Sequence, residues 1–179
     1  MTVRAVIGYY PNGKKHGVNA KTIMEVSGVY DKWAGSPDNL IPGLQQEVRN
    51  YHNNDWRLYV KREVQSKRDF GREVPCKRLY EFGRLGIEWV YIIHTGGIDI
   101  LANIVTTKKN AKRDGVMGFE PLTISSAKPG EGYGWVLVRE DVPFDVSLSE
   151  LRGMTAEHIA REVVAEERIK REAAAAPAA

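Results

Sequence analysis

The sequence predicts an α+β fold: an antiparallel sheet of about five to six strands built from hairpins, with two N-terminal helices and a C-terminal helix. Two apolar runs, residues 87–94 and 98–105, lie on either side of a glycine pair, which is typical of a β-hairpin. Before residue 52 apolar side chains recur at helical spacing, and the chain ends in a charged, alanine-rich stretch.

The composition is that of one intracellular globular domain. The chain has 179 residues, of which 42% are hydrophobic and 27% charged, and these values argue against a disordered chain. The single cysteine, Cys76, cannot form an internal disulfide, and no apolar run approaches the roughly 20 residues that span a bilayer. We therefore expect a protein of the cytoplasm, or of a virion if it is viral, with no membrane partner and no cofactor.

The charge is unevenly distributed along the chain. Residues 51–113 carry 13 Lys and Arg against 7 Asp and Glu, whereas residues 114–179 carry 7 against 12. A basic middle can bind an anionic partner, or it can pack against the acidic C-terminal third of this or another copy. We expect an α+β core domain over residues 1–146, a helical extension over 147–174 and a tail over 175–179.

The N-terminal part predicts one strand and two helices. Residues 3–10 favour a strand, which a Pro-Asn-Gly turn ends. A first helix is predicted over residues 20–34, capped by Asn19 and stopped by Gly35. Its apolar stripe consists of Ile23, Val26, Tyr30 and Trp33. A second helix follows before His52, with a stripe formed by Leu44, Val48 and Tyr51.

From Asp55 onward the apolar pattern changes to a period of two. Apolar and polar side chains alternate over residues 56–64, which predicts a half-buried strand with one polar face. Residues 65–78 are polar and contain Gly and Pro, so they predict a loop. A short helix over residues 77–84 is expected to point its large apolar side chains, Leu79 and Phe82, inward.

The central hairpin is the clearest prediction. If Gly96 and Gly97 form a two-residue type I′ turn, His94 faces Asp99 on the neighbouring strand. Both strands are apolar on both faces, which places this hairpin at the centre of the sheet. A basic loop and a second hairpin follow, predicted over residues 108–118, 119–127 and 133–140.

The C-terminal region predicts a surface helix. Ser147 with Glu150 three residues later resembles a capping box, and Thr155 is expected to cap the final helix over residues 156–174. Its core-facing stripe is thin and consists of Ile159, Val163 and Ile169. A helix with so few apolar contacts is marginal on its own, so it is expected to lie on the surface, reach a partner subunit or fray.

A basic strand and loop form the first candidate site, for nucleic acid. Positive side chains neutralise phosphates, and an interleaved aromatic ring offers a surface on which a base can stack. The residues concerned are Arg57, Tyr59, Lys61, Lys67, Arg68 and Arg72. The alternative is a solvated face whose charges Glu63, Asp69 and Glu73 partly cancel.

The second candidate site is the pair His94 and Asp99, the only weak catalytic candidates in the chain. A carboxylate can orient an imidazole for acid–base chemistry, provided that both side chains open into a pocket. A cross-strand polar pair that merely stabilises the sheet is the commoner arrangement. The four histidines show no metal-ligand spacing, and no phosphate-binding glycine motif is present, so no metal site is predicted.

These observations leave three functional hypotheses open. The leading one is a non-catalytic assembly or interaction protein, such as a structural component of a virion or other large complex, with homo-oligomers or other protein subunits as partners. Its support is the absence of a compact catalytic motif, the richness in Trp and Tyr, and the thin C-terminal helix. The alternatives are a nucleic-acid-binding protein that uses residues 57–78, and a small hydrolase or nuclease that uses His94 and Asp99.

Overall fold

Six strands form one mixed sheet in the part of the chain that the structure describes, in the order β2-β1-β3-β4-β6-β5. The structure is a computed structural model, and it describes residues 3–13, 15, 17–19, 21–31, 35–64, 78–123 and 129–177. The strands are β1 (Arg4–Tyr9), β2 (Glu25–Asp31), β3 (Trp89–His94), β4 (Gly97–Thr107), β5 (Met117–Pro121) and β6 (Glu131–Val142). The α+β class is therefore confirmed.

One pair of neighbouring strands, β1 and β3, runs parallel, whereas the other pairs are antiparallel. The two predicted hairpins are confirmed as β3–β4 and β5–β6, but the prediction of a wholly antiparallel sheet is wrong. Parallel neighbours need a long crossover between them. The chain between Tyr9 and Trp89 supplies it and carries a second strand and helices on the way.

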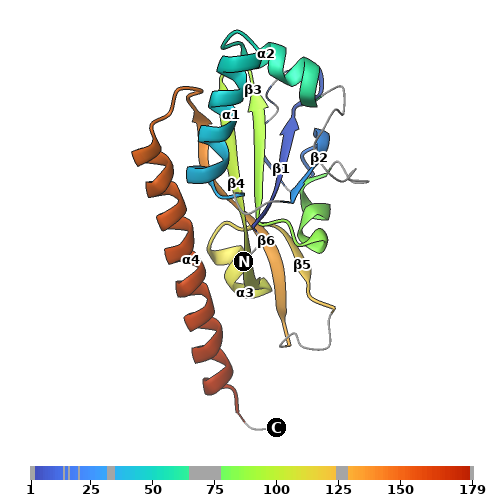
Figure 1. The fold of residues 1–179 in the computed structure, drawn as a ribbon. Coiled ribbons are helices and arrows are strands. Elements are labelled where there is room, and N and C mark those ends of the chain that lie inside the picture. Colours follow the sequence, from blue (N-terminus) through green and yellow to red (C-terminus); the bar gives the residue numbers. More distant parts are fainter. Residues whose placement is uncertain are drawn as a thin grey trace.

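Helical segments cover both faces of the sheet. The structure contains α1 (Pro37–Tyr51), α2 (Trp56–Tyr59), α3 (Lys108–Arg113) and α4 (Leu148–Ala175), a π-helical turn η2 (Val60–Val64), and two 3-10 segments, η1 (Pro11–Gly13) and η3 (Leu79–Leu85). Figure 1 shows α1 and α4 along one face of the sheet. None of the helices described is both long and apolar enough to cross a bilayer.

The two larger apolar clusters hold these layers together, one on each face of the sheet. On the first face α1, α2 and α4 pack against β3, with Leu151 and Trp89 among the buried contacts. On the second face η3 places Leu79 and Phe82 against the sheet, where they lie in one cluster with Trp135. The inward direction predicted for Leu79 and Phe82 is confirmed, because each is fully buried.

The predicted first helix, residues 20–34, is wrong, because the chain forms strand β2 over part of this range. The sequence here contains β-branched residues and a glycine, which are poor helix formers. Pairing with β1 gives the backbone of β2 its hydrogen bonds, and Val6 lies opposite Val29 in the register. The second predicted helix is confirmed as α1, and Leu44 and Val48 of its predicted stripe are buried, whereas Tyr51 is exposed.

The predicted strand over residues 56–64 is also wrong, because this segment is helical as α2 and η2. Asn53 and Asn54 adopt positive φ angles of 52° and 58° and end the preceding helix. Asp55 then caps α2, since its Oδ1 accepts hydrogen bonds from the amides of Arg57 and Leu58. Apolar residues four apart fit both periods, and Trp56, Val60 and Val64 are buried along one helical face.

The central hairpin has a different register from the predicted one. His94 pairs with Gly97 and Ile92 with Asp99, so the turn consists of Thr95 and Gly96. The prediction that His94 lies directly opposite Asp99 is wrong by this shift. The hairpin does lie at the centre of the sheet, because β1 flanks β3 and β6 flanks β4.

The segment after the central hairpin contains a short helix where a loop was predicted. The hydroxyl of Thr107 accepts a hydrogen bond from the amide of Asn110 and so caps α3. Strand β5 begins at Met117, and β6 extends to Val142, two residues beyond the predicted end. Residues 124–128 of the predicted hairpin lie outside the described residues.

One continuous helix, α4, replaces the predicted short segment and final helix. Ser147 and Glu150 form the predicted capping box, in which each side chain bonds the other residue's amide. Thr155 is not a cap, because it lies inside the helix and donates to the carbonyl of Leu151. Of the predicted inward stripe only Ile169 is buried, whereas Ile159 and Val163 are half-exposed. The side chains that are buried are Leu151, Met154, His158, Ala165 and Ile169.

Candidate functional site

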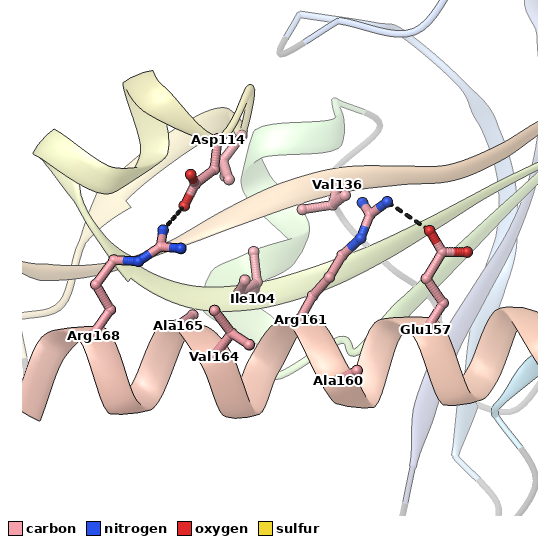
Figure 2. Close-up of a pocket in the computed structure, with 10 residues that line it drawn as sticks. Ile104, Asp114, Val136, Glu157, Ala160, Arg161, Val164, Ala165 and Arg168 are labelled. Atoms are coloured by element: carbon pink, nitrogen blue, oxygen red, sulfur yellow. Dashed lines mark hydrogen bonds and ion pairs between the residues drawn. The ribbon is translucent and has the colours of Figure 1, made fainter.

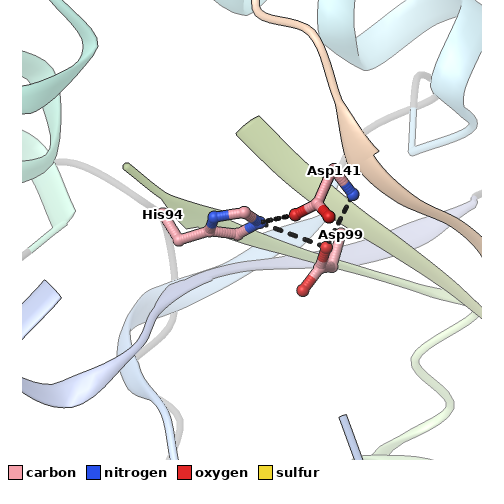
Figure 3. A group of neighbouring side chains, drawn as sticks. All are labelled: His94, Asp99 and Asp141. Carbon is pink, nitrogen blue, oxygen red and sulfur yellow. Dashed lines mark hydrogen bonds and ion pairs between the residues drawn. The ribbon is translucent and has the colours of Figure 1, made fainter. Parts of the chain in front are cut away.

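The predicted pair His94 and Asp99 meets at one end of the sheet, as Figure 3 shows. His94 ends β3 and Asp99 lies near the start of β4, and the shifted register places them as diagonal neighbours on one face. The distance from Nε2 of His94 to Oδ1 of Asp99 is 3.1 Å. His94 is 2% exposed and Asp99 0%. Neither side chain opens to solvent, which the catalytic hypothesis requires.

Residues far away in the sequence complete the site around Asp99. The hydroxyl of Tyr10 donates to Oδ2 of Asp99 at 2.7 Å, and the amide of Asp141 donates to Oδ1 at 3.0 Å. The Nζ of Lys15 lies 2.6 Å from Oδ1 of Asp141 and 2.7 Å from Oε1 of Glu140. We call these side chains the polar cluster: Tyr10, Lys15, His94, Asp99, Glu140 and Asp141.

The charges in the polar cluster stabilise one another. Burial, together with the hydrogen bond to Asp99, raises the pKa of Tyr10 far above its ordinary value. Partial burial of Lys15 lowers its pKa, but hydrogen bonds to Asp141 and Glu140 outweigh this effect and the pKa is raised. The hydrogen bond from Lys15 lowers the pKa of Asp141. Lys15 and Asp141 are therefore an ion pair at neutral pH.

The hydrogen bonds of His94 determine its tautomer. The amide of Gly96 donates to Nδ1 at 3.1 Å, so Nδ1 carries a lone pair and Nε2 carries the proton. That proton points toward Asp99 and toward Oδ1 of Asp141, which lies 3.3 Å away. A general base needs an open lone pair on the ring, and both nitrogens of His94 are already engaged. The pair therefore acts as a structural anchor in this arrangement.

Three side chains of the polar cluster also lie close enough together to be considered as metal ligands. The donor atoms of His94, Asp99 and Asp141 lie within 4.8 Å of one another. However, the ammonium group of Lys15 lies 3.5 Å from Asp99 and pairs with Asp141, so it takes the place of a cation between these carboxyl groups. Ligation through Nε2 of His94 would also require its proton to move to Nδ1, which would break the hydrogen bond from the amide of Gly96. These residues do not fit a metal centre.

A backbone irregularity directs Asp141 into the polar cluster. The register between β4 and β6 shifts between Ile98 and Leu101, which is a β-bulge. Asp141 itself has a φ of 54°, in the left-handed region that few non-glycine residues adopt. Strain of this kind persists only where surrounding contacts hold it. The contacts here are those with Lys15, His94 and Asp99.

Acidification is expected to remove the contribution of Asp141 to stability. Its pKa is lower in the folded than in the unfolded chain, so its contribution is full above the unfolded value near 3.8 and is lost as the pH falls through the folded value. Urea unfolding of the wild type and of Asp141→Asn at several pH values measures this. The gap between their midpoints should be clear at pH 7 and shrink below about pH 4.

Asparagine suits this test because it also tolerates a positive φ, so the backbone of the bulge is kept. A Lys15→Met background serves as the control. Because Lys15 is the main cause of the lowered pKa, the effect of Asp141→Asn in that background should be small at every pH. A gap that stays constant from pH 7 to pH 2.5 would contradict the ion-pair account.

The predicted nucleic-acid residues do not share one face. Arg57 and Lys61 are exposed on α2 and η2, but Tyr59 is fully buried. Its ring packs edge-to-face on His52 and Trp56, so no base can stack on it. Lys67, Arg68 and Arg72 lie outside the described residues. Nucleic-acid contact through residues 57–78 stays a prediction, but the ring of Tyr59 cannot provide the stacking surface that it included.

The outward side of α4 is a feature that the sequence interpretation missed. Among the described residues, four of the seven large apolar side chains that are clearly exposed lie on this helix: Leu148, Ile159, Val163 and also Val164, which lines a pocket with Ile104 and Val136 of the sheet. Ile159 is 53% exposed and Val163 51%. Sequence periodicity places these two residues correctly on one helical face but gives no information on which face meets the sheet.

Tyr10, Lys15, Glu140 and Asp141 were likewise missing from the sequence-predicted site. They are between 42 and 126 residues from their partners along the chain, so no local sequence spacing indicates them. The positive φ of Asp141 is a property of the folded backbone.

Comparisons with protein-family models, with curated proteins and with solved structures find no match to this chain.

Proposed function

We propose that this chain is a non-catalytic assembly protein whose copies contact one another through the outward side of α4. The observation that carries the proposal is the pair Ile159 and Val163, which lie one helical turn apart with about half of each side chain exposed. Neighbouring apolar side chains on a rigid helix are typical of subunit contacts. At 28 residues α4 is about 42 Å long, which offers an extended surface to a partner.

The charges beside these residues favour a second copy in the antiparallel direction. Arg152, Ile159 and Glu166 follow one another at seven-residue intervals and therefore lie along one line of the helix. In a two-fold pair centred on Ile159, Arg152 of each copy lies opposite Glu166 of the other. Opposite charges at these flanking positions determine partner and orientation in helical pairs.

The polar cluster supports the non-catalytic part of the proposal. Its buried members are bonded to one another, and the imidazole of His94 has neither nitrogen open to a substrate. Hydrolysis by His94 and Asp99 would first require this cluster to rearrange. Membership of a virion stays a prediction, since it depends on the identity of the larger assembly.

Ile159→Glu is expected to convert the assembled protein into monomers. Light scattering coupled to size-exclusion chromatography, at several concentrations, should give the mass of at least a dimer for the wild type and of one chain for the variant. A buried glutamate without a partner costs several kcal/mol, more than a small helix contact supplies. Tyr51→Glu, at a 73% exposed position of α1, is the matched control and should leave the mass unchanged.

Charge exchange tests the antiparallel geometry. Arg152→Glu and Glu166→Arg should each weaken the dimer, because each places like charges opposite one another in both halves of the pair. The double variant restores opposite charges and should restore the dimer. A wild type that is monomeric at every concentration would refute the proposal, and dimers without rescue by the double variant would refute this geometry.

A further inference from the structure

A groove runs between α4 and strands β4 and β6, as Figure 2 shows. It has a volume of about 500 Å³. Ile104, Val136 and Ala165 form its apolar floor, and each is less than 10% exposed. The groove exists because α4 presents small side chains here, Ala160 and Ala165, whereas nearer the start of the helix Leu151 and Met154 fill the space against the sheet.

Ion pairs close both ends of the apolar floor (Figure 2). At one end Arg168 bonds Asp114 at 2.6 Å, and at the other Arg161 bonds Glu157 at 2.7 Å. Along the helix the two arginines are seven residues apart, or about 10 Å. Both guanidinium groups line the groove, so they lie within reach of a molecule seated on its floor.

The four charged side chains that line the groove balance one another, but two further arginines beside them, Arg113 and Arg139, give the rim an excess of positive charge. Each of its carboxyl groups has a second arginine partner, since Arg113 bonds Asp114 at 3.1 Å and Arg139 bonds Glu157 at 2.7 Å. Four guanidinium groups therefore surround two carboxylates. These arginines lower the pKa of Asp114 and of Glu157, so both acids are ionised at neutral pH and the excess is two positive charges.

We propose that this groove binds a single-chain anionic amphiphile, such as a medium-chain carboxylate, as a monomer. The apolar floor takes up the hydrocarbon chain, and the excess positive charge of the rim attracts the carboxylate, with Arg161 and Arg168 as its hydrogen-bond donors. The volume lies in the range of small-molecule sites, about 300–1,000 Å³. The groove does not share Ile159 or Val163 with the proposed subunit contact.

Titration calorimetry of the full chain with dodecanoate, below its micelle concentration, tests the proposal. One molecule should bind per chain, and saturably. Dodecanol, which lacks the charge, should bind at least about tenfold more weakly, because a charge-assisted hydrogen bond contributes about that factor. The dodecyltrimethylammonium cation should not bind, because the rim repels it.

Variants locate the binding in the groove. Ala160→Trp adds a large side chain at an exposed position that lines the groove, so it should abolish binding while the fold is kept. Arg161→Gln and Arg168→Gln should each weaken binding about tenfold. The matched control is Arg171→Gln, because Arg171 lies on the same helix, is 84% exposed and pairs only with Glu167 among the described residues.

Three results would overturn the inference: no saturable binding by the folded chain, equal affinity for dodecanol, or undiminished binding by Ala160→Trp. If the chain does not bind dodecanoate but binds an acidic amphipathic peptide, and Arg161→Gln weakens that binding, the groove is assigned to a protein partner instead. Circular dichroism confirms that each variant is folded. Ile159→Glu should retain dodecanoate binding, which separates this inference from the assembly proposal.

Discussion

Replacing Asp99 with alanine is expected to destabilise the fold by about 3–5 kcal/mol, the cost of removing one partner from a buried polar pair. The change removes the carboxylate that accepts from the Tyr10 hydroxyl and from the Asp141 amide. It also removes one of the two carboxylates that the His94 ring N–H faces. Each buried donor that loses its acceptor costs about 1–3 kcal/mol. The free energy of unfolding, obtained from urea denaturation followed by tryptophan fluorescence, measures the loss.

Tyr10→Phe is a milder variant that serves as the control for Asp99→Ala. It removes one hydrogen bond and keeps the ring, so it should cost about 1 kcal/mol. If the polar cluster is the anchor described above, Asp99→Ala and Tyr10→Phe are also coupled, and their effects should not add. A cost below about 1 kcal/mol for Asp99→Ala would show that water replaces the carboxyl group and that the cluster is not an anchor.

Gly97→Ala is expected to destabilise the protein by about 2–4 kcal/mol, through backbone strain and a steric clash. Gly97 begins β4 with a φ of 145°, a conformation that residues with a side chain rarely adopt. An added Cβ would meet the carbonyl oxygen of Val142 and lie 3.0 Å from the carbonyl carbon of Asp141. The obstacle is the backbone of β6 at the bulge, which cannot move aside as a side chain can.

Gly153→Ala is the matched control for Gly97→Ala and should have the opposite sign. Gly153 lies inside α4, and a Cβ added there meets no other atom within 4 Å. Alanine in a helix interior is up to about 1 kcal/mol more favourable than glycine. Thermal unfolding of both variants measures the difference. Equal effects at the two positions would mean that the approach of β6 to the hairpin is not as close as described.

The closeness of His94 and Asp99 could be predicted from the sequence, but their register could not. His94 and Asp99 are five residues apart on either side of a glycine-rich turn, so any tight hairpin places them close together. The register could not be predicted, because both Thr95-Gly96 and Gly96-Gly97 can form the turn. Contacts with β6 at the bulge decided it, and these depend on residues more than forty positions away.

The segment 56–64 shows how local patterns can mislead. Trp56, Val60 and Val64 are separated by four residues, which satisfies an alternating strand and a helix equally. The capping carboxylate of Asp55 and the positive φ angles of Asn53 and Asn54 favour the helix. The aromatic ring of Tyr59 is then buried, so the predicted face of basic and aromatic side chains does not form.

By itself the sequence determined the elements whose pattern is local: the central hairpin, helix α1, the inward side of η3 and the capping box at Ser147. The apolar spacing, turn residues and cap residues that indicate them lie within short stretches of the chain, so the local sequence encodes them. Only the tertiary structure decided the parallel β1–β3 pair, the face of α4 that meets the sheet, and the meeting of Lys15 with Asp141. The physical reason is that these depend on contacts between distant parts of the chain, where burial and charge pairing override local preference.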